Sequence, residues 1–403
     1  MSKVIERWNV HPNSPWLRGV RPDKPVEFVE QLGSWSAYGF AEVEQILGDA
    51  SAFSAKTAAY AAVQVDPKFQ EGDISQMDPP EQTKYRKLIG RAFSPKVIAS
   101  LEPRIHEITN ELLDAAAEKD GFELVADFAY PLPVRVIADL LGLDSKDFDL
   151  FKGAAFDIIE NMAGLDFVAG GDGIEDQIHA AEARLKPLLD YMLDQVLQRR
   201  ERPREDLLTY LIQSEDDGQR LTDNEVVNIA NVLLITGHIT STMMVGNTMA
   251  CLDLERDKLV QVREDRSLVP TAIEEALRLL PPAATLSRVT TRDVEIGGVT
   301  IPAEQMILPW VGAANRDPLK FDRPDEYDPA RTPNDHISFG NGIHYCLGTR
   351  LARLEGRIAI NALLDRYPDF TTDQDKTAFF PSEDMVGVRA MHVLPAEGSK
   401  GKA

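Results

Sequence analysis

Apolar and polar side chains follow two different periods along this chain. From about residue 81 to 280, apolar positions recur at three- and four-residue spacing, which is the period of one face of a helix. The stretches that show it best are Leu101–Ala117, Leu132–Leu141 and Ala180–Arg200. Residues Thr285–Ile307 instead show the two-residue period of strands, with a glycine pair for the turn. Helical spacing resumes at Leu347, so the pattern predicts a mainly α protein with a minor β part.

The first 80 residues are rich in Pro and Gly, which favours loops, short strands and one or two helices over that range. No repeat, low-complexity tract or linker divides the chain of 403 residues. We therefore expect a single domain over residues 1–403, with a mixed loop- and strand-rich part to about residue 80 and a helix-rich remainder. Because 43% of the residues are apolar, the core is large enough to enclose a large organic cofactor.

One segment carries no acidic or basic side chain for 27 residues, from Val226 to Leu252. Thr222 and Glu225 form a capping-box start just before it. Such a helix spans roughly 40 Å at 1.5 Å per residue, enough to cross a membrane or a large domain. Polar residues on all its sides, among them Asn231 and Asn247, are costly in lipid. We predict a helix that crosses the middle of a soluble domain.

Charge and cysteine content narrow the class of protein. The chain has 43 basic and 65 acidic residues, and its net charge of -22 repels phosphate backbones, so nucleic acid is not an expected partner. Only Cys251 and Cys346 occur, which is no disulfide framework and is typical of a reducing compartment. The first residues contain no apolar run for a signal peptide or membrane anchor. We expect a cytoplasmic protein.

The strongest local pattern surrounds the second cysteine and reads Phe339-Gly-Asn-Gly-Ile-His-Tyr-Cys346-Leu-Gly348, with a helix after it. A cysteine before a helix N-terminus faces the positive end of the helix dipole, which favours the thiolate. A buried structural cysteine is one alternative, and zinc bound by His336, His344 and Cys346 is another. Neither explains the aromatic residue, the two glycines and the histidine together.

This stretch resembles the haem-binding loop of the cytochrome P450 family, F-G-x-G-x-H-x-C-x-G, and matches every fixed position. The resemblance extends over roughly residues 30–395, in the style of the soluble bacterial members. It implies the fold of that family, with haem b between the long central helix and the helix after the cysteine loop. It also implies that Cys346 is the axial thiolate ligand of the iron, which favours cleavage of the O–O bond.

The resemblance assigns further residues to the cofactor and its support. Glu275 and Arg278 match the family's E-x-x-R, which helps to hold the cysteine loop, and Arg331 is similar to the third member of that structural network. The two haem propionates need cationic or hydrogen-bonding partners. The matching candidates for cofactor binding are Arg86, Gln82 in place of the family's usual histidine, Arg288 and His344, with Phe339, Gly340 and Gly348 of the loop.

The middle of the uncharged helix reads Thr236-Gly-His-Ile-Thr240-Ser and is similar to the family's A-G-x-(D/E)-T-(T/S). Gly237 and Thr240 match, but Ile239 takes the place of the acid that helps to deliver protons. Water organised by Thr240, with Ser241 or His238, is then the expected proton source. Two explanations stay open: either the enzyme is slow, leaks peroxide or gives an atypical outcome such as desaturation, oxidative coupling or peroxide-driven oxidation, or an acid elsewhere reaches the same water while Ile239 faces a core pocket. By itself, His238 fits helix packing better than acid–base chemistry.

The chain has no G-x-G-x-x-G after a strand and no P-loop, so the resemblance implies electrons from a separate ferredoxin and its reductase. A basic patch on the cysteine side is one hypothesis for their docking, and ordinary solvated helix faces are the other. Its candidate members are Arg350, Arg353, Arg357, Lys87 and Arg91.

The family's substrate-lining segments are here mostly apolar. They lie near residues 60–77 and 155–180, at Leu233–Thr240, at Pro282–Leu286 and in the turn Asp384–Val386, with a glycine-rich stretch at 169–173 for a lid. We expect a monooxygenase that hydroxylates or epoxidises a mainly apolar organic substrate, free or carrier-bound, in natural-product tailoring. A haem sensor or electron carrier is the non-enzymatic alternative, and it gives no reason for the polar residues of the central helix.

Overall fold

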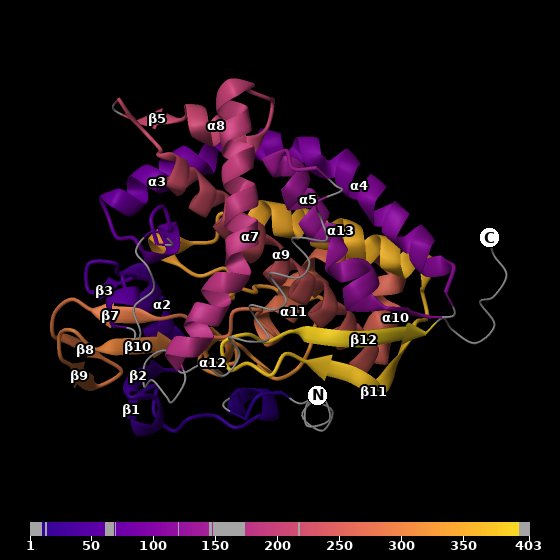
Figure 1. Ribbon diagram of the computed structural model, residues 1–403. Coiled ribbons are helices and arrows are strands. Elements are labelled where there is room, and N and C mark those ends of the chain that lie inside the picture. The colour runs from indigo at the N-terminus through magenta and orange to yellow at the C-terminus, as the bar shows by residue number, and fades with distance from the viewer. Residues whose placement is uncertain are drawn as a thin grey trace.

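Helix α9 (Asp223–Leu254) runs through the middle of the molecule, and other helices pack around it (Figure 1). The computed structural model describes residues 10–12, 14–60, 68, 70–119, 121–144, 147, 174–216 and 218–394. The predicted capping box is present: the Thr222 side chain accepts from the Glu225 amide, and the Glu225 carboxylate accepts from the Thr222 amide. These bonds satisfy amide groups that the first turn of a helix leaves without partners.

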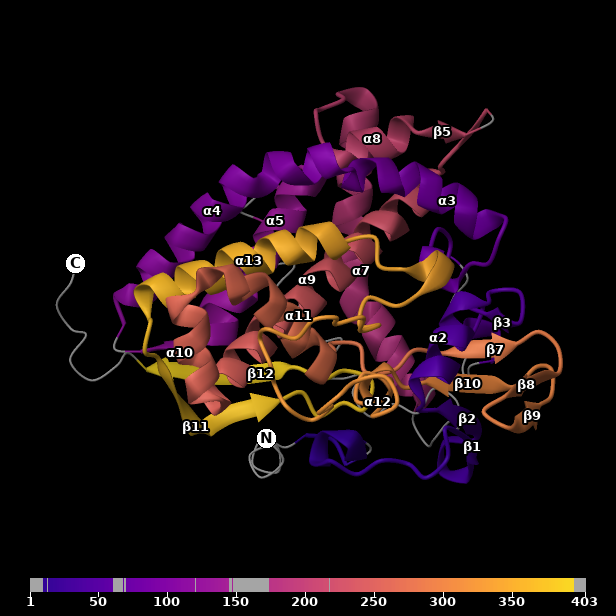
Figure 2. The ribbon, with the colours of Figure 1, turned by 180° about the vertical axis from the view of Figure 1, so that it is seen from behind.

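The remaining helices have the following bounds: α2 (Phe40–Gly48), α3 (Glu81–Gly90), α4 (Pro95–Ala117), α5 (Pro131–Leu141), α7 (Ile174–Glu201), α8 (Leu207–Gln213), α10 (Arg256–Glu264), α11 (Val269–Leu279), α12 (Val311–Ala314) and α13 (Thr349–Arg366). Short 3-10 turns are η1 (Pro15–Arg18), η2 (Glu30–Leu32), η3 (Ala58–Tyr60), η5 (Ile74–Gln76), η6 (Arg91–Phe93), η9 (Arg266–Leu268) and η10 (Gly342–His344), and η7 (Val125–Ala129) is a π-helical turn. Helices α5, α7, α11 and α13 contact α9. Figure 2 shows α13 between α4 and α11, both of which it contacts.

The strands form small sheets at the edge of the helical part (Figure 1). The largest sheet has the order β1-β2-β10-β7-β3, from β1 (Val26–Val29), β2 (Ser34–Ala37), β10 (Met306–Pro309), β7 (Arg288–Thr290) and β3 (Phe53–Ser54). Only β2 and β10 pair in parallel within it, with Ile307 opposite Trp35. A second sheet joins β11 (Thr371–Phe379), β12 (Val388–Leu394) and β4 (Phe122–Glu123). Two further hairpins are described: β5 (Glu215–Asp216) with β6 (Gln219–Arg220), and β8 (Val294–Ile296) with β9 (Val299–Ile301).

Helix α9 is long and apolar enough to cross a membrane, but the fold buries it. Within its most apolar 18-residue window, 67% of the residues are buried. A β-carbon added at Gly246 would lie 3.0 Å from the Val388 side chain, so β12 packs directly on the backbone of α9. In this structure α9 is the core helix that the sequence predicts.

The predicted elements agree with the structure in kind. The three periodic stretches lie in α4, α5 and α7, the strands from residue 285 to 307 are β7 to β10, and the helix expected at Leu347 begins at Thr349. The described residues among the first 80 contain one α-helix, α2, together with β1 to β3 and short turns. The mainly α fold with a minor β part is therefore confirmed.

Candidate active site at the cysteine loop

The loop before α13 turns tightly and returns on itself. Gly340 and Gly342 have φ angles of 75° and 67°, in the left-handed region that glycine adopts without strain. A β-carbon at Gly342 would lie 2.7 Å from the Leu47 carbonyl oxygen, so only glycine fits. The Cys346 amide donates to the Phe339 carbonyl at 2.9 Å, which closes the loop. Cys346 lies near the end of this loop and is exposed.

Helix α13 begins at Thr349, three residues after Cys346. Gly348 is the N-cap residue, and the Thr349 hydroxyl donates to the Cys346 carbonyl at 2.8 Å. The positive end of a helix dipole stabilises an anion, so this position favours a thiolate. Cys251 differs in both respects, because it is fully buried in α9 and burial raises the pKa of its thiol to about 12. Of the two cysteines, only Cys346 has the exposure that a metal ligand needs.

A buried ionic network joins α11 to the segment before the cysteine loop. Arg278 donates to both carboxylate oxygens of Glu275 at 2.8 Å, and both side chains are completely buried. Arg331 donates to the same carboxylate at 2.9 Å and to the Asp322 carbonyl at 2.7 Å. Asn334 adds a bond of 3.1 Å, so each carboxylate oxygen is satisfied. The structure therefore brings together the three residues that the sequence assigned to this network.

Two polar side chains continue this support into the loop itself. Asn315, whose carbonyl accepts from Arg278, accepts from the Ile337 amide at 3.0 Å and donates to the Ser338 hydroxyl at 2.8 Å. Ser338 in turn donates to the Leu277 carbonyl at 2.8 Å. The chain just before Phe339 is thus fixed to α11 by hydrogen bonds.

Helix α3 holds the other side of the loop. The buried Gln82 side chain donates to the Ile343 carbonyl at 2.7 Å, and Arg86 donates to the Tyr345 carbonyl at 2.6 Å. The Gln82 amide nitrogen therefore donates to the backbone of the loop, a role that the sequence did not predict.

Arg288 and His344 place buried polar groups beside the loop. Arg288 is only 7% exposed, it donates to the Ser287 carbonyl at 2.7 Å, and burial lowers the pKa of its guanidinium. His344 has a buried Nε2 without a hydrogen-bond partner, and burial followed by the charge of Arg288 lowers its pKa to about 4. A buried guanidinium that forms no ion pair within the described residues, and a buried ring nitrogen without a hydrogen-bond partner, fit the two propionates of a haem.

Helix α9 presents an open face although most of its surface is buried. Thr236 and Gly237 are exposed, and Leu233 and Thr240 are half-buried, at the spacing of one helical face. The Thr240 hydroxyl donates to the Thr236 carbonyl at 3.0 Å, within the helix. A face of small and hydroxyl-bearing residues is suited to a flat cofactor and small polar molecules on that side.

The neighbours of Thr240 point elsewhere. Ile239 is buried against Met243 and Phe380, so it faces a core cluster, which was one of the two explanations for the missing acid. His238 is buried, its Nδ1 bonds the Leu234 carbonyl, and its ring meets Tyr130 edge-on at 5.2 Å. Burial lowers the pKa of His238 to about 4, so the ring is neutral at pH 7 and packs helix against helix.

Two buried polar residues near the site were missed in the sequence analysis. Glu355 of α13 is 2% exposed and hydrogen-bonds the Ser241 side chain. Asn247 of α9 donates to the carbonyls of Leu280 and Val386 and accepts from the Val388 amide, at 2.8, 2.9 and 3.1 Å. A carboxylate on the buried stripe between Leu351 and Ile358 was a signal that could have revealed Glu355.

Asn247 fixes two of the predicted substrate-lining segments. The Ala284 amide donates to the Asp384 carbonyl at 2.8 Å and the Val386 amide to the Pro282 carbonyl at 3.0 Å, so the segments lie side by side. Met385 and Ile235 pack on the cluster of Ile239, Met243 and Phe380. The expected segments at 61–67, 69 and 151–173, including the lid stretch 169–173, lie outside the described residues.

The predicted basic patch is partly neutralised. Arg353 bonds Glu274 at 2.6 Å, and Arg357 bonds Glu102 at 2.6 Å. Arg350 is exposed, and within the described ranges no ion pair involves it. The zinc alternative is wrong: in the part of the chain that the structure describes, no three His, Cys, Asp or Glu side chains gather closely enough to hold a metal, and His336 instead bonds Glu274.

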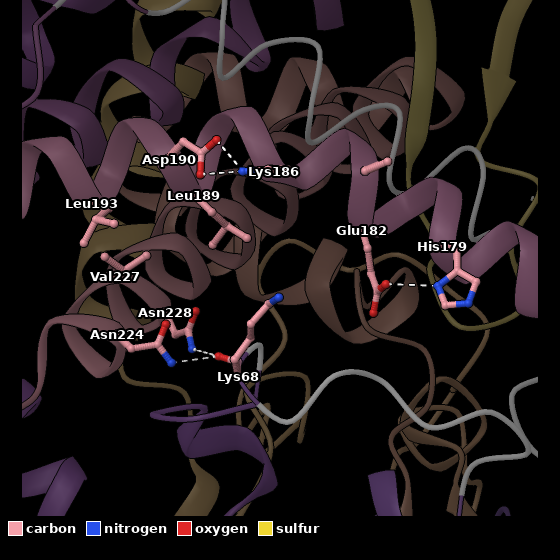
Figure 3. Close-up of a pocket in the computed structure, with 11 residues that line it drawn as sticks. Lys68, His179, Glu182, Lys186, Leu189, Asp190, Leu193, Asn224, Val227 and Asn228 are labelled. Atoms are coloured by element: carbon pink, nitrogen blue, oxygen red, sulfur yellow. Dashed lines mark hydrogen bonds and ion pairs between the residues drawn. The ribbon is translucent and has the colours of Figure 1, made fainter.

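A separate cavity of about 470 Å³ lies between α7 and the first turns of α9 (Figure 3). Its charges are internally paired, Lys186 with Asp190 and His179 with Glu182, and Asn224 and Asn228 both donate to the Lys68 carbonyl. Asn228 is twelve residues before Thr240, roughly 18 Å along the helix axis. This cavity is therefore distinct from the open face of α9 at Thr240.

An exposed cysteine before a helix, in a fold with a long hydroxyl-bearing core helix, is typical of the class of haem-thiolate enzymes, and comparisons with known proteins agree. The family model described as cytochrome P450 matches residues 254–391. The chain is 37% identical to the erythromycin C-12 hydroxylase of Saccharopolyspora erythraea over 96% of each chain, and 36% identical to the cyclomarin C epoxidase CymV of Salinispora arenicola over 94% of each. The crystal structure of HmtT, involved in himastatin biosynthesis, matches with a TM-score of 0.88 and 54% identity over 97% of this chain and 99% of that one.

The chain belongs to the cytochrome P450 family. It is a monooxygenase, and its cofactor is the haem with an axial cysteine thiolate that this family uses. Its similarity to hydroxylases and epoxidases of secondary-metabolite pathways supports a tailoring role.

Proposed function

We propose that this enzyme inserts one oxygen atom from O2 into a mainly apolar natural product, by hydroxylation or epoxidation, with Cys346 as the iron ligand. The observation that carries this proposal is the exposed Cys346 at the start of α13, in a loop that α3 and α11 both hold. Bound haem supplies the chemistry of dioxygen activation. The protein supplies binding, orientation and protons.

The residues around the loop would hold the haem as follows. Arg288 and His344 would bind the propionates, because Arg288 carries a buried positive charge and the buried Nε2 of His344 has no hydrogen-bond partner among the described residues. Arg86 lies close enough to lower the pKa of His344 and would add positive charge. Gln82 would support the loop backbone, and Glu275, Arg278 and Arg331 would fix the segment that leads into it.

An apolar substrate fits the side chains near the open face of α9. Ile235, Phe380 and Met385 belong to one apolar cluster there, and the Pro282–Leu286 segment lies beside Met385. The relatives named for erythromycin and cyclomarin C point to natural products of comparable character. The substrate, free or tethered to a carrier protein, would bind beside Thr240 and contact this apolar cluster.

Electrons would come from a ferredoxin and its reductase in the cytoplasm. The exposed Arg350 lies four residues after Cys346, and electrostatic attraction to an acidic ferredoxin would act there. The pairing of Arg353 and Arg357 with carboxylates reduces the patch on α13 to Arg350, and the exposed Arg91 follows α3 in the chain.

Oxygen labelling tests the proposal. The holoenzyme, ferredoxin, reductase and NADPH are supplied with ¹⁸O2 and a panel of apolar natural products that includes cyclomarin C and the erythromycin precursors. The expected product of at least one compound carries a single ¹⁸O atom. Label from water, or product only when hydrogen peroxide replaces the redox partners, would contradict the proposal.

A second outcome is favoured by one observation, the replacement of the usual acid by Ile239 in a core cluster. If proton supply is slow, desaturation or oxidative coupling becomes competitive. The labelling experiment distinguishes desaturation from hydroxylation, because a desaturated product loses two hydrogens and gains no ¹⁸O.

A further inference from the structure

The open face of α9 ends one helical turn after Thr240. Leu233 and Thr240 are half-buried and lie two turns apart, whereas Met243, in the next turn, is fully buried. Gly387 covers it so closely that a β-carbon at Gly387 would overlap the Met243 side chain. The turn between β11 and β12, residues 380–387, therefore packs directly on α9 and closes the open face beside Thr240.

Two segments of the chain form this boundary together. Ala283 and Met385 pair as an antiparallel β-bridge, which joins residues 281–286 to residues 380–387. Both side chains are half-buried, so the fold leaves part of their apolar surface uncovered. Met385 also packs on the buried cluster that contains Ile239. We call these two segments, residues 281–286 and 380–387, the end wall.

A single side chain of α9 holds both parts of the end wall. Asn247 follows Thr240 by seven residues, which places it on the same face of the helix two turns further along. Its amide nitrogen donates to the Leu280 carbonyl at 2.8 Å and to the Val386 carbonyl at 2.9 Å. Its amide oxygen accepts from the Val388 amide at 3.1 Å. Asn247 thus uses both of its donor hydrogens and its acceptor on the backbone at the ends of the end wall.

The surroundings of these bonds exclude water. The four residues that make them are each at most 2% exposed, namely Asn247, Leu280, Val386 and Val388. Without the amide, two carbonyls and one N–H group would lose a partner at the same time, and water could not reach them. Unsatisfied buried backbone groups are costly, so the chain would move to satisfy them elsewhere.

The turn itself keeps its shape through bonds that do not involve α9. The Phe380 amide donates to the Gly387 carbonyl at 3.0 Å, and the Ser382 hydroxyl oxygen accepts from two amides of the turn at 3.2 Å each. Loss of the Asn247 bonds should therefore displace the turn as a unit instead of unfolding it. The half-buried Met385, which the turn carries, would be displaced with it.

We propose that Asn247 is a positioning residue that determines substrate specificity, because it fixes the end wall beside Thr240. The end wall then limits how bulky an apolar substrate can be and which of its carbon atoms is oxidised. Asn247 acts through the backbone groups that it binds and not by contact with the substrate. The inference rests on the proposed function, since it assigns the end wall to the substrate of that reaction.

Two azoles separate positioning from stability. Imidazole and 4-phenylimidazole both bind haem iron through a ring nitrogen, but only the phenyl group is large enough to depend on the end wall. A mismatch of one methylene group in an apolar pocket is worth roughly tenfold in binding. Asn247→Leu should therefore weaken 4-phenylimidazole roughly tenfold and change the Kd of imidazole less than about twofold. Spectral titration of the holoenzyme measures both Kd values.

Asn231→Leu is the matched control. Asn231 is another buried asparagine of α9, but its amide nitrogen donates to the Val227 carbonyl of its own helix. This variant should leave both azole affinities at the wild-type values. Asn247→Ser, which is smaller and keeps one hydroxyl donor, is a milder change and should fall between the wild type and Asn247→Leu. If both variants of Asn247 bind the two azoles as the wild type does, or weaken them by the same factor, the proposal is wrong.

The products of turnover give a second readout. With the panel compound that yields most product, Asn247→Leu should change the ratio of oxidation sites by roughly tenfold, because the substrate is no longer held in one orientation beside Thr240. Asn231→Leu should give the wild-type ratio. An unchanged ratio in Asn247→Leu, or an equal change in the two variants, overturns the proposal.

The carbon monoxide spectrum keeps the two levels separate. If the reduced wild-type protein lacks the thiolate-type band, the proposed function fails. If the wild type and Asn247→Leu both have that band while neither the azole affinities nor the product ratio responds to Asn247, the proposed function stands and this inference fails.

Discussion

The side-chain amide of Gln82 donates a hydrogen bond of 2.7 Å to the carbonyl oxygen of Ile343. This bond joins α3 to the cysteine loop across 261 residues of sequence. Together with the bond from Arg86 to the Tyr345 carbonyl, it holds the loop on the side opposite to α11. The loop therefore depends on two helices that are far apart in the chain.

Replacing Gln82 by Leu should loosen the loop. The Ile343 carbonyl would lose its donor, and an unsatisfied buried acceptor costs about 1–3 kcal/mol. We expect a lower free energy of unfolding in urea and a faster transfer of haem to apomyoglobin. Gln198→Leu, at an exposed glutamine of α7, should change neither quantity. Equal behaviour of the two variants would show that the bond does not support the loop.

Breaking the buried network should have a larger effect. Arg331→Met leaves the Glu275 carboxylate with one fewer cation in a site that excludes water, and such a loss costs roughly 3–5 kcal/mol. Thermal unfolding and the haem content of the purified protein are the measurements. Lys186→Met removes an exposed ion pair with Asp190 and should cost less than about 1 kcal/mol. A similar, small cost for both variants contradicts a supporting role of the network.

Arg288 should bind the cofactor rather than stabilise the fold. Arg288→Gln removes a buried positive charge that forms no ion pair within the described residues, so apoprotein stability should be kept or increased. Haem affinity should fall by roughly tenfold to a hundredfold, the size of one charge-assisted hydrogen bond. Titration of the apoprotein with haemin measures it, with the exposed Arg292→Gln as control. Unchanged haem affinity would show that Arg288 does not bind the haem propionates.

His238 should make the protein sensitive to acid. Its pKa is about 4 in the folded chain and 6.5 ordinarily, so below pH 6.5 the unfolded chain takes up a proton that the folded chain refuses. Stability from this group is complete above pH 6.5 and is lost as the pH falls towards 4. At pH 5 the loss is on the order of 2 kcal/mol.

The variant His238→Phe keeps an aromatic ring against Tyr130 and removes the titration. Urea unfolding at pH 7 and pH 5 should therefore show a smaller loss of stability for His238→Phe than for the wild type. The exposed His106→Phe should behave as the wild type does. An identical loss in all three proteins would mean that His238 does not resist protonation.

Charge reversal at Arg350 should slow reduction by ferredoxin. Arg350→Glu places a negative charge four residues after Cys346, where an acidic ferredoxin would approach, and the effect should weaken as salt is added. Stopped-flow reduction under carbon monoxide measures the rate directly. Arg292→Glu, in the loop before β8, is the matched control. If both variants are reduced at the wild-type rate, the ferredoxin docks elsewhere.

Local patterns predicted much of this structure because they reflect local causes. The capping box at Thr222, the polar residues of α9 and the glycines of the cysteine loop each have a physical reason within a few residues of sequence. The E-x-x-R pair and Arg331 were predicted through the family resemblance, and the structure brings them together.

Long-range contacts explain what the sequence did not reveal. The bond of Gln82 to Ile343 and that of Glu355 to Ser241 depend on how α3 and α13 pack, and no local period encodes those positions. Ile239 is similar: its place in the sequence marks a missing acid, but only the fold shows that the residue faces Met243 and Phe380.

The carbon monoxide difference spectrum of the reduced protein tests the central claim most directly. The wild type and Cys251→Ala should both show the red-shifted Soret band of a thiolate-ligated haem, because Cys251 is buried in α9. Cys346→Ala should lose that band, while retained far-ultraviolet circular dichroism shows that it is folded. Absence of the band in the wild type, or its persistence in Cys346→Ala, would contradict the assignment of Cys346 as the iron ligand.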